Sequence, residues 1–480
     1  MATLESAERR GISLPWFPFL PLAALVLVGT TPTTLQWLLV GTMAVLLALG
    51  LGRPVWAAAA VLVLELTIGN YMLPVAGGQV SLRLVVTASA LLLALYHLLR
   101  GARLQGGLLL LLSLAFVGVC GATAYLNTDL AQAFKAMRFL ATGLAAVVTL
   151  AVGLQTRDDL RLLLWVGLVT CLLSALAAIS QHYNPMVGTP LVVTIPYRVG
   201  GISFQDLAGR AIGLAENPLH LADDMMLGLL VLSGVFVSVP FSLRQRWALA
   251  LSALTLLAAL YFSYTRSWPL AAGVGALAFL AYRGPYRRDV WLGLLLVAAA
   301  VVYVSDLRAN RYTVTEDDST LSRPILWQAA TWMALDHPYL GIGPGRFVQL
   351  APDYQTAVDP ELLRQERQMG KRSVLGVYTP HNDYLNVWVT YGLPALGLYL
   401  ALLVTAGLRL LRAYRLARDH LLQGVALGLL AALMAYAVNS AFHNYFDSAI
   451  TLWMLVGAAA AVGGLVGREE RYAAADAPGR

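Results

Sequence analysis

The sequence predicts an all-α polytopic membrane protein with 12–14 transmembrane helices and one long loop, outside the membrane, that contains helices of its own. Of its 480 residues, 59% are hydrophobic and 12% are charged, whereas soluble domains carry about 25% charged residues. A chain of this composition cannot cover a globule of its size with polar surface, so lipid must cover much of it. Apolar runs of the ~20 residues needed to span a bilayer also recur along the chain.

Fourteen apolar segments fit a spanning helix, although three of them, 55–69, 82–99 and 268–282, are short. The fourteen are 14–30, 35–52, 55–69, 82–99, 106–125, 137–155, 162–180, 219–241, 247–265, 268–282, 290–305, 384–407, 421–441 and 448–467. They predict four parts of the chain. Residues 1–305 form an N-terminal transmembrane bundle, which includes a loop over 181–218. A long loop (306–383), C-terminal transmembrane helices (384–467) and a tail (468–480) follow.

The basic residues predict the orientation in the membrane. Over the span ends and short loops, Lys and Arg number nineteen on the side of both termini and six on the other side, which places the termini in the cytoplasm. The six are Arg83, Lys135, Arg138, Arg198, Arg210 and Arg266. The remaining eight lie in 306–380, a loop too long to count. Because the net charge of +7 is scattered in ones and twos, no nucleic-acid partner is expected.

The long outer loop contains one predicted helix, over 324–336. Pro324 suits the first turn of a helix, and Ile325, Ala329 and Trp332 recur on one face. The pattern ends at His337, which precedes another proline. We expect this helix to lie over the mouth of the bundle.

Three outer arginines are candidate phosphate ligands, because charges near membrane depth are costly and a guanidinium binds phosphate through two parallel donors. Arg266 lies in Y-F-S-Y-T-R-S-W-P, a short turn between two spans, and a headgroup-binding arginine is the alternative reading. Arg210 precedes the eighth span, where Asn217 and the following proline predict a helix start. Pairing with Glu216 or Asp206 is its alternative. Arg198, in the same loop, is a further candidate.

His381 is the candidate general base, because it lies where the long loop meets a spanning helix and an imidazole with a pKa of ~6.5 accepts a proton at neutral pH. A helix-capping or interface histidine is the alternative. Asn382 follows it and could orient its surroundings, and His443, in F-H-N-Y-F-D, could line the same cavity. No Asp, Glu and His set has the spacing of a metal site.

With these residues in view, the chain resembles the O-antigen ligase and polymerase superfamily of bacterial membrane glycosyltransferases, over roughly 190–460. The resemblance rests on four motifs in order: R-A-I-G-L-A-E-N-P (210–218), Y-T-R-S-W (264–268), R-P-I-L-W-Q-A-A-T-W-M-A-L-D-H-P-Y-L-G-I-G-P-G-R-F (323–347) and H-N-D-Y-L-N-V-W-V-T-Y-G-L-P-A-L-G-L (381–398). The last fits the family pattern of His-Asn, nine residues and then Gly, ending at Gly392.

The resemblance implies a GT-C-like, inverting glycosyltransferase of the bacterial inner membrane that needs neither metal nor cofactor. Such enzymes take a glycan from undecaprenyl diphosphate at the periplasmic face, and in the ligases the acceptor is a sugar hydroxyl of lipid A–core. Arg210 and Arg266 match the phosphate-binding arginines of the family, with Arg198 as the rival of Arg210, and His381 matches its catalytic histidine.

Other functions stay open at this point. Polymerases and protein O-oligosaccharyltransferases share the motifs, and the sequence does not reveal the acceptor pocket that would separate them from ligases. A glycolipid or ion transporter would need polar residues through the middle of the bundle and interrupted helices in both halves. The predicted spans are instead runs of Leu, Ala and Val with charges on the outer side, which favours a transferase.

Overall fold

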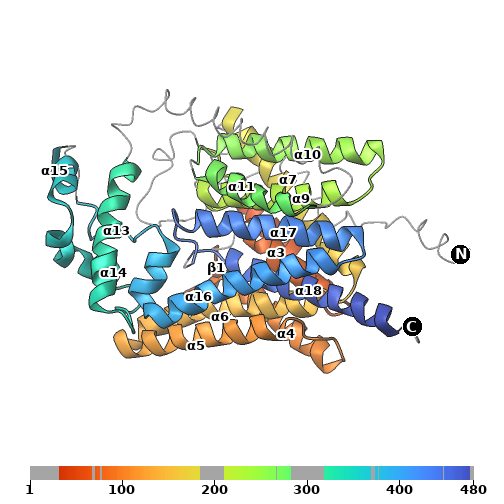
Figure 1. Cartoon of the computed structure of the whole chain (residues 1–480), viewed down its shortest axis with the longest axis horizontal. Coiled ribbons are helices and arrows are strands. Elements are labelled where there is room, and N and C mark those ends of the chain that lie inside the picture. Colours follow the sequence, from red (N-terminus) through yellow and green to blue (C-terminus); the bar gives the residue numbers. More distant parts are fainter. Residues whose placement is uncertain are drawn as a thin grey trace, which may run out of the picture.

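The structure, a computed structural model, is a bundle of long helices with a smaller helical group at one end (Figure 1). It describes residues 32–67, 71–75, 78–183, 210–265, 267–282, 318–368, 373–376, 378–446 and 448–475. The long helices run alongside one another, and α13 (Asp318–Asp336), α14 (Phe347–Leu350) and α15 (Pro360–Gln368) lie beyond one end of them. The predicted fold class, an all-α polytopic membrane protein, is confirmed.

The bundle is formed by two sets of helices. The first set is α2 (Pro32–Gly50), α3 (Val55–Glu65), α4 (Leu82–Leu99), α5 (Gly107–Asn127), α6 (Leu130–Gly153) and α7 (Arg157–Tyr183). The second is α9 (Pro218–Ser238), α10 (Leu243–Phe262), α11 (Trp268–Ala276) continued by the 3-10 helix η2 (Leu277–Ala281), α16 (Asp383–Leu416), α17 (His420–Asn439) and α18 (Thr451–Ala475).

Among the described residues, nine helices are long and apolar enough to cross a membrane, and three shorter apolar helices accompany them. Together they occupy twelve of the fourteen predicted spans. The other two predicted spans, 14–30 and 290–305, lie outside the described residues. The agreement follows from composition, because runs this apolar are stable only as helices covered by lipid or by other helices.

The helices differ in how much of their surface other helices cover. On α10, Leu243, Trp247, Leu251 and Leu254 form an exposed stripe that suits contact with lipid. In contrast, α17 packs against α9, α11, α16 and α18. Its contact with α9 is close, since a Cβ added to Gly234 would lie 2.4 Å from the carbonyl oxygen of a glycine in α17. Small residues of this kind let membrane helices approach at the backbone.

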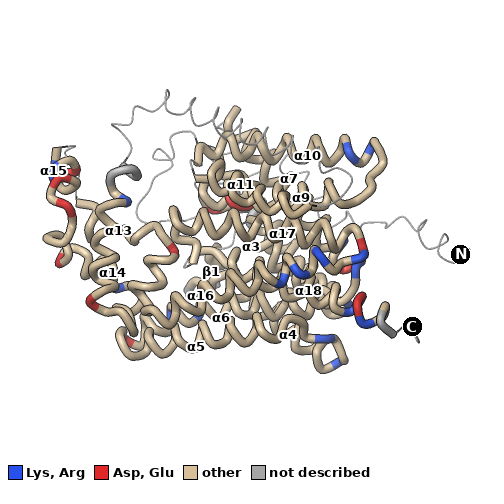
Figure 2. Tube along the Cα trace, viewed as in Figure 1, with Lys and Arg blue, Asp and Glu red and all other residues tan. Residues whose placement is uncertain are grey.

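Charge is distributed unevenly between the two ends of the bundle (Figure 2). Lys and Arg of the connections α2–α3, α4–α5, α6–α7, α9–α10 and α16–α17, and of the end of α18, gather at the end opposite α13. At this end Arg157 pairs with Asp419, at 2.9 Å, and also with Glu469. The two ion pairs join the start of α7 to the α16–α17 connection and to the end of α18. The described basic residues of the predicted cytoplasmic side therefore lie at one end of the bundle.

A β-hairpin and the start of α13 depart from the predictions. A short antiparallel hairpin of β1 (Met72–Val75) and β2 (Gly78–Ser81) precedes α4 and was not predicted. The helix predicted over 324–336 begins earlier, at Asp318, so the placement of Pro324 in its first turn is wrong. Trp332, expected on the buried face, is 50% exposed. The buried stripe of α13 is centred on Leu326, Ala330 and Met333, which pack onto the neighbouring segments. Trp332 lies at the edge of this stripe.

The helix α16 is broken at Gly392, where φ is +83° and ψ is 175°. The break frees carbonyl groups, and the loop that follows α13 bonds to them. The N–H groups of Ile342 and Gly343 donate to the carbonyls of Val389 and Thr390, at 2.8 and 2.9 Å, and Leu393 donates to the carbonyl of Pro338 at 2.7 Å. The backbone of the outer helical group is thereby joined directly to a helix of the bundle.

Gly392→Ala is expected to lower the free energy of unfolding by about 3 kcal/mol, because the backbone there suits only glycine and the new methyl group overpacks the site. Its Cβ would lie 2.0 Å from the carbonyl oxygen of Tyr339. Unfolding in detergent micelles measures the loss. Gly397→Ala is the matched control in the same helix, since a Cβ there meets nothing within 4 Å. Equal stability of the two variants would show that the break tolerates a side chain.

Candidate active site

His381 lies in the turn that leads into α16, with a backbone φ of +50° that is rare for a residue with a side chain. This conformation costs about 1–2 kcal/mol, so neighbouring contacts must hold it. Trp327 of α13 donates from Nε1 to the carbonyl of Pro380 at 2.8 Å. On the other side, Asn382 caps α16 by accepting from the N–H of Leu385 at 3.1 Å. The imidazole is therefore presented from a turn fastened at both ends.

A second segment, between α17 and α18, supports this turn. The N–H of Asn382 donates to the Asn444 side chain at 3.1 Å, and the Nδ2 of Asn444 donates to the Thr379 hydroxyl. Asp383 donates from its N–H to the carbonyl of Ser440 at 2.7 Å, and its carboxylate accepts from the N–H of Phe446 at 2.9 Å. The side chain of Asn382 thus serves as a helix cap, and its backbone is bound to the segment that carries His443.

His443 is buried, and its Nε2 lies 2.6 Å from the hydroxyl of Ser267. Burial lowers the pKa of His443 well below its ordinary value, and the nearby positive charge of Arg323 lowers it further. The charge of Arg210, and that of His381 when it is protonated, act on the pKa of His443 in the same direction. His443 therefore lies within electrostatic range of both the candidate base and a candidate phosphate ligand, which brings three predicted site residues into one region.

Arg210 is fastened to the turn that follows α10. Its Nε donates to the carbonyl of Ser263 at 2.9 Å, and its Nη2 donates to the Thr265 hydroxyl at 3.2 Å. The N–H of Ala211 also donates to the carbonyl of Phe262, at 3.0 Å. These bonds fix the plane of the Arg210 guanidinium beside Thr265, the residue that precedes Arg266 in the sequence.

Two of the predicted phosphate ligands, Arg198 and Arg266, lie outside the described residues, and so does Asp206. Asn217 caps α9 by accepting from the N–H groups of Leu219 and His220, both at 2.9 Å, so the predicted helix start is confirmed. Glu216, the other predicted partner of Arg210, lies 3.6 Å from His220 and 3.9 Å from Arg83.

The electrostatic surroundings of His381 favour its neutral form. Burial lowers the pKa of His381 to about 4, and the positive charge of Arg323 contributes to the shift. A lowered pKa means that the imidazole loses its proton well below neutral pH, so at pH 7 it is able to accept one. Arg323 begins the third motif, but its effect on His381 was not predicted, because it depends on how α13 packs over the turn.

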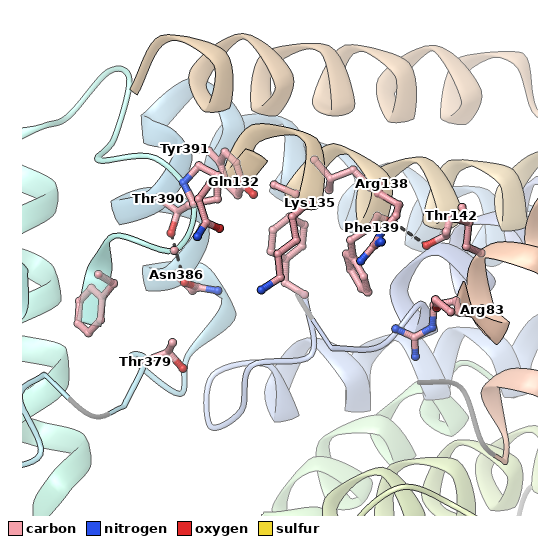
Figure 3. Close-up of a pocket in the computed structure, with 18 of the residues that line it drawn as sticks. Arg83, Gln132, Lys135, Arg138, Phe139, Thr142, Thr379, Asn386, Thr390 and Tyr391 are labelled. Atoms are coloured by element: carbon pink, nitrogen blue, oxygen red, sulfur yellow. Dashed lines mark hydrogen bonds between the residues drawn. The ribbon is translucent and has the colours of Figure 1, made fainter. Parts of the chain in front are cut away.

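A cavity of about 400 Å³ is lined by Thr379 of the same turn (Figure 3). It is bordered by Thr379 of the turn, by Asn386 and Thr390 of α16, and by Phe446. From α4 and α6, Arg83, Lys135 and Arg138 also line it. Among the described residues, no three His, Cys, Asp or Glu side chains are grouped to hold a metal ion.

Comparison with known families supports the predicted relationship. The family model described as O-antigen ligase matches residues 250–400, a range that contains α11, α13 and the His381 turn. This match confirms the resemblance to the O-antigen ligase and polymerase superfamily, whose members are glycosyltransferase-like enzymes of lipid-linked glycans. No curated protein matches the chain.

The protonation of His381 is directly measurable. In histidine-labelled protein followed by NMR, the His381 imidazole is expected to titrate with a midpoint about 4. Arg323→Gln should raise this midpoint, because a positive charge that favours the neutral imidazole is removed. Arg364→Gln, which changes an exposed arginine of α15, should leave it in place. A midpoint near 6.5 in the unmodified protein would show that neither partial burial nor Arg323 lowers the pKa of His381.

Proposed function

We propose that this protein is an O-antigen ligase, which transfers a glycan from undecaprenyl diphosphate to a sugar hydroxyl of lipid A–core. The observation that carries the proposal is the position of His381, which is held neutral in a fastened turn within electrostatic range of His443, itself under the influence of Arg210. The match of residues 250–400 to the O-antigen ligase family supports the same reaction.

The reaction requires a base and a stabilised leaving group. The acceptor hydroxyl attacks the anomeric carbon of the donor glycan, and its proton passes to the imidazole of His381. The bond from that carbon to the diphosphate oxygen breaks, and the diphosphate leaves with the electron pair. Arg210 and Arg266 stabilise its negative charge, with Arg198 as the alternative to Arg210. Attack opposite the leaving group inverts the anomeric configuration, and the lipid diphosphate supplies the activation, so no nucleotide or metal is required.

The low pKa of His381 is compatible with this role. Before the donor binds, the positive charge of Arg323 favours the neutral imidazole. A bound diphosphate would add negative charge nearby, which raises the pKa of an imidazole and makes it a stronger base. His381 would therefore become the better proton acceptor when the donor is in place.

The placement of charge supports an orientation for the reaction. Basic connections gather at the end of the bundle opposite α13, which suits a cytoplasmic face. The His381 turn lies at the other end of α16, next to α13. We therefore assign the reaction to the periplasmic face of the inner membrane, with both termini in the cytoplasm.

His381→Ala is expected to lower the rate of glycan transfer by at least about 100-fold, because removal of a general base typically has an effect of this size. Transfer from a synthetic undecaprenyl diphosphate glycan to lipid A–core, followed by mass spectrometry, measures the rate. His420→Ala is the matched control, since this histidine begins α17 at the opposite end of the bundle. Near-normal transfer by the His381 variant would exclude it as the base.

Arg266→Lys is expected to lower transfer by about tenfold or more, because an ammonium point charge replaces a planar fork that binds phosphate through two donors. The same assay measures the loss. Arg412→Lys, at the basic end of α16, provides the matched control. Full activity of the Arg266 variant would favour a headgroup-binding role for this arginine.

A polymerase of the same superfamily is the second candidate, because the matched family belongs to a superfamily that includes both ligases and polymerases. A deletion strain separates the two. Long glycan chains that accumulate without attachment to lipid A indicate a ligase, whereas single unpolymerised repeats indicate a polymerase.

A further inference from the structure

Three outer cations are not used by the proposed reaction, and they meet in one cavity. Of the six Lys and Arg residues that the sequence places on the outer side, Arg198, Arg210 and Arg266 are the candidate phosphate ligands. The other three, Arg83, Lys135 and Arg138, all line the cavity of about 400 Å³ beside the His381 turn (Figure 3). The positive-inside tendency opposes basic residues on this side, so their convergence calls for another explanation.

The sequence of α6 directs polar and basic side chains to the cavity. Gln132, Lys135, Phe139 and Thr142 recur at helical spacing, and all four line the cavity. Arg138 lines it from the neighbouring position on the helix surface. In Figure 3, Lys135 extends from α6 and Arg83 from α4 toward the same space, and Asn386 faces it from α16. The three helices therefore present their polar side chains to a common volume.

The charge of the cavity is positive. None of the described residues that line it is Asp or Glu. Arg83 is buried and lies 3.5 Å from Glu65 and 3.9 Å from Glu216, so these two carboxylates compensate its charge. Lys135 and Arg138 are exposed, and they make no hydrogen bond or ion pair with the described part of the chain. Their two charges therefore act on whatever enters the cavity, and an anion is the favoured ligand.

The surroundings of the cavity suit a lipid. Beside Lys135, Leu130 and Phe134 at the outer end of α6 are 73% and 71% exposed, and Tyr125 and Leu126 at the end of α5 are 68% and 63% exposed. An exposed apolar surface at the end of spanning helices fits the lipid tails and the interface region. A ligand that combines acyl chains with a phosphate would meet apolar residues outside the cavity and two cations within it.

We propose that the cavity between α4, α6 and α16 binds the phosphate-bearing headgroup of the lipid-linked acceptor, with Lys135 and Arg138 as its phosphate ligands. This inference rests on the proposed function, because it assigns the acceptor of that reaction.

The two substrates then approach the base from different helices. Arg210 belongs with α9 and α10, whereas the cavity belongs with α4 and α6, which lie on the other side of α16 and α17 in Figure 1. Thr379 borders the cavity and lies two residues before His381. An acceptor held in the cavity therefore reaches the His381 turn from the side away from Arg210. Such an arrangement suits an inverting reaction, in which the hydroxyl attacks opposite the leaving group.

The test compares binding of phosphorylated lipid A with binding of the same lipid after phosphatase treatment, using native mass spectrometry of the full chain without donor. The phosphorylated lipid is expected to bind at least about tenfold more tightly, because two charge-assisted contacts hold the phosphate. In a Lys135→Gln and Arg138→Gln double variant, this difference should disappear. Arg364→Gln, which removes an exposed arginine of α15, should keep it.

The remaining outcomes overturn the proposal. Equal binding of the two lipids, or an unchanged difference in the double variant, would show that the cavity does not hold the phosphate. Competition by phosphatidylglycerol at equal concentration would indicate a general anionic-lipid site, and full competition by inorganic phosphate would indicate a site for the free ion. The catalytic proposal is separate, since His381→Ala should keep acceptor binding while losing transfer. Transfer that persists in that variant excludes His381 as the base whatever the binding result.

Discussion

The break of α16 at Gly392 is the constraint on which the rest of the outer end depends. The backbone of Gly392 approaches the carbonyl of Tyr339 so closely that no side chain fits between them. The freed carbonyls of Val389 and Thr390 accept from Ile342 and Gly343, so that buried backbone groups stay paired despite the break. The loop after α13 is thereby fixed to α16, and α13 is held over the turn that carries His381. Trp327 of α13 also contacts the turn and its supporting segment directly, through its hydrogen bond to Pro380 and the approach of its ring to Phe442.

The same junction explains the electrostatics of the site. Because α13 packs over the turn, it both removes water from His381 and brings Arg323 near it, and both effects favour the neutral imidazole. The charge of Arg323 also lowers the pKa of His443. Arg210 approaches from α9 and α10, held by carbonyl and hydroxyl acceptors of the turn after α10. A neutral base and a fixed cation thus come from segments more than a hundred residues apart.

Much of the fold follows from the sequence because lipid imposes simple requirements on length and composition. Twelve of the predicted spans correspond to described helices, and Asn217 caps α9 where its sequence position indicated. The break in α16 was not predicted, although Gly392 was recognised as part of a motif, because the need for glycine arises from the approach of a distant loop. The misplacement of Pro324 and Trp332 has a similar cause, since packing against α16 and its neighbours decides which face of α13 is buried.

The candidate site was likewise only partly predictable, because some of its residues come together only through packing. Motif residues such as His381 and Arg210 are recognisable from their local context, whereas Arg323 acts only through the fold. Lys135 and Arg138 were counted as basic residues on the outer side, and their common cavity became visible only when α4, α6 and α16 were placed together. Arg198 and Arg266 lie outside the described residues, so their roles remain predictions.

The most direct test of the central claim is a cryo-electron microscopy structure with a non-transferable undecaprenyl diphosphate glycan bound. The account predicts density for the diphosphate beside Arg210 and Arg266, with the first sugar lying between the phosphates and the imidazole of His381. A diphosphate bound in the cavity of Lys135 and Arg138, or separated from His381 by more than one sugar can bridge, would contradict it.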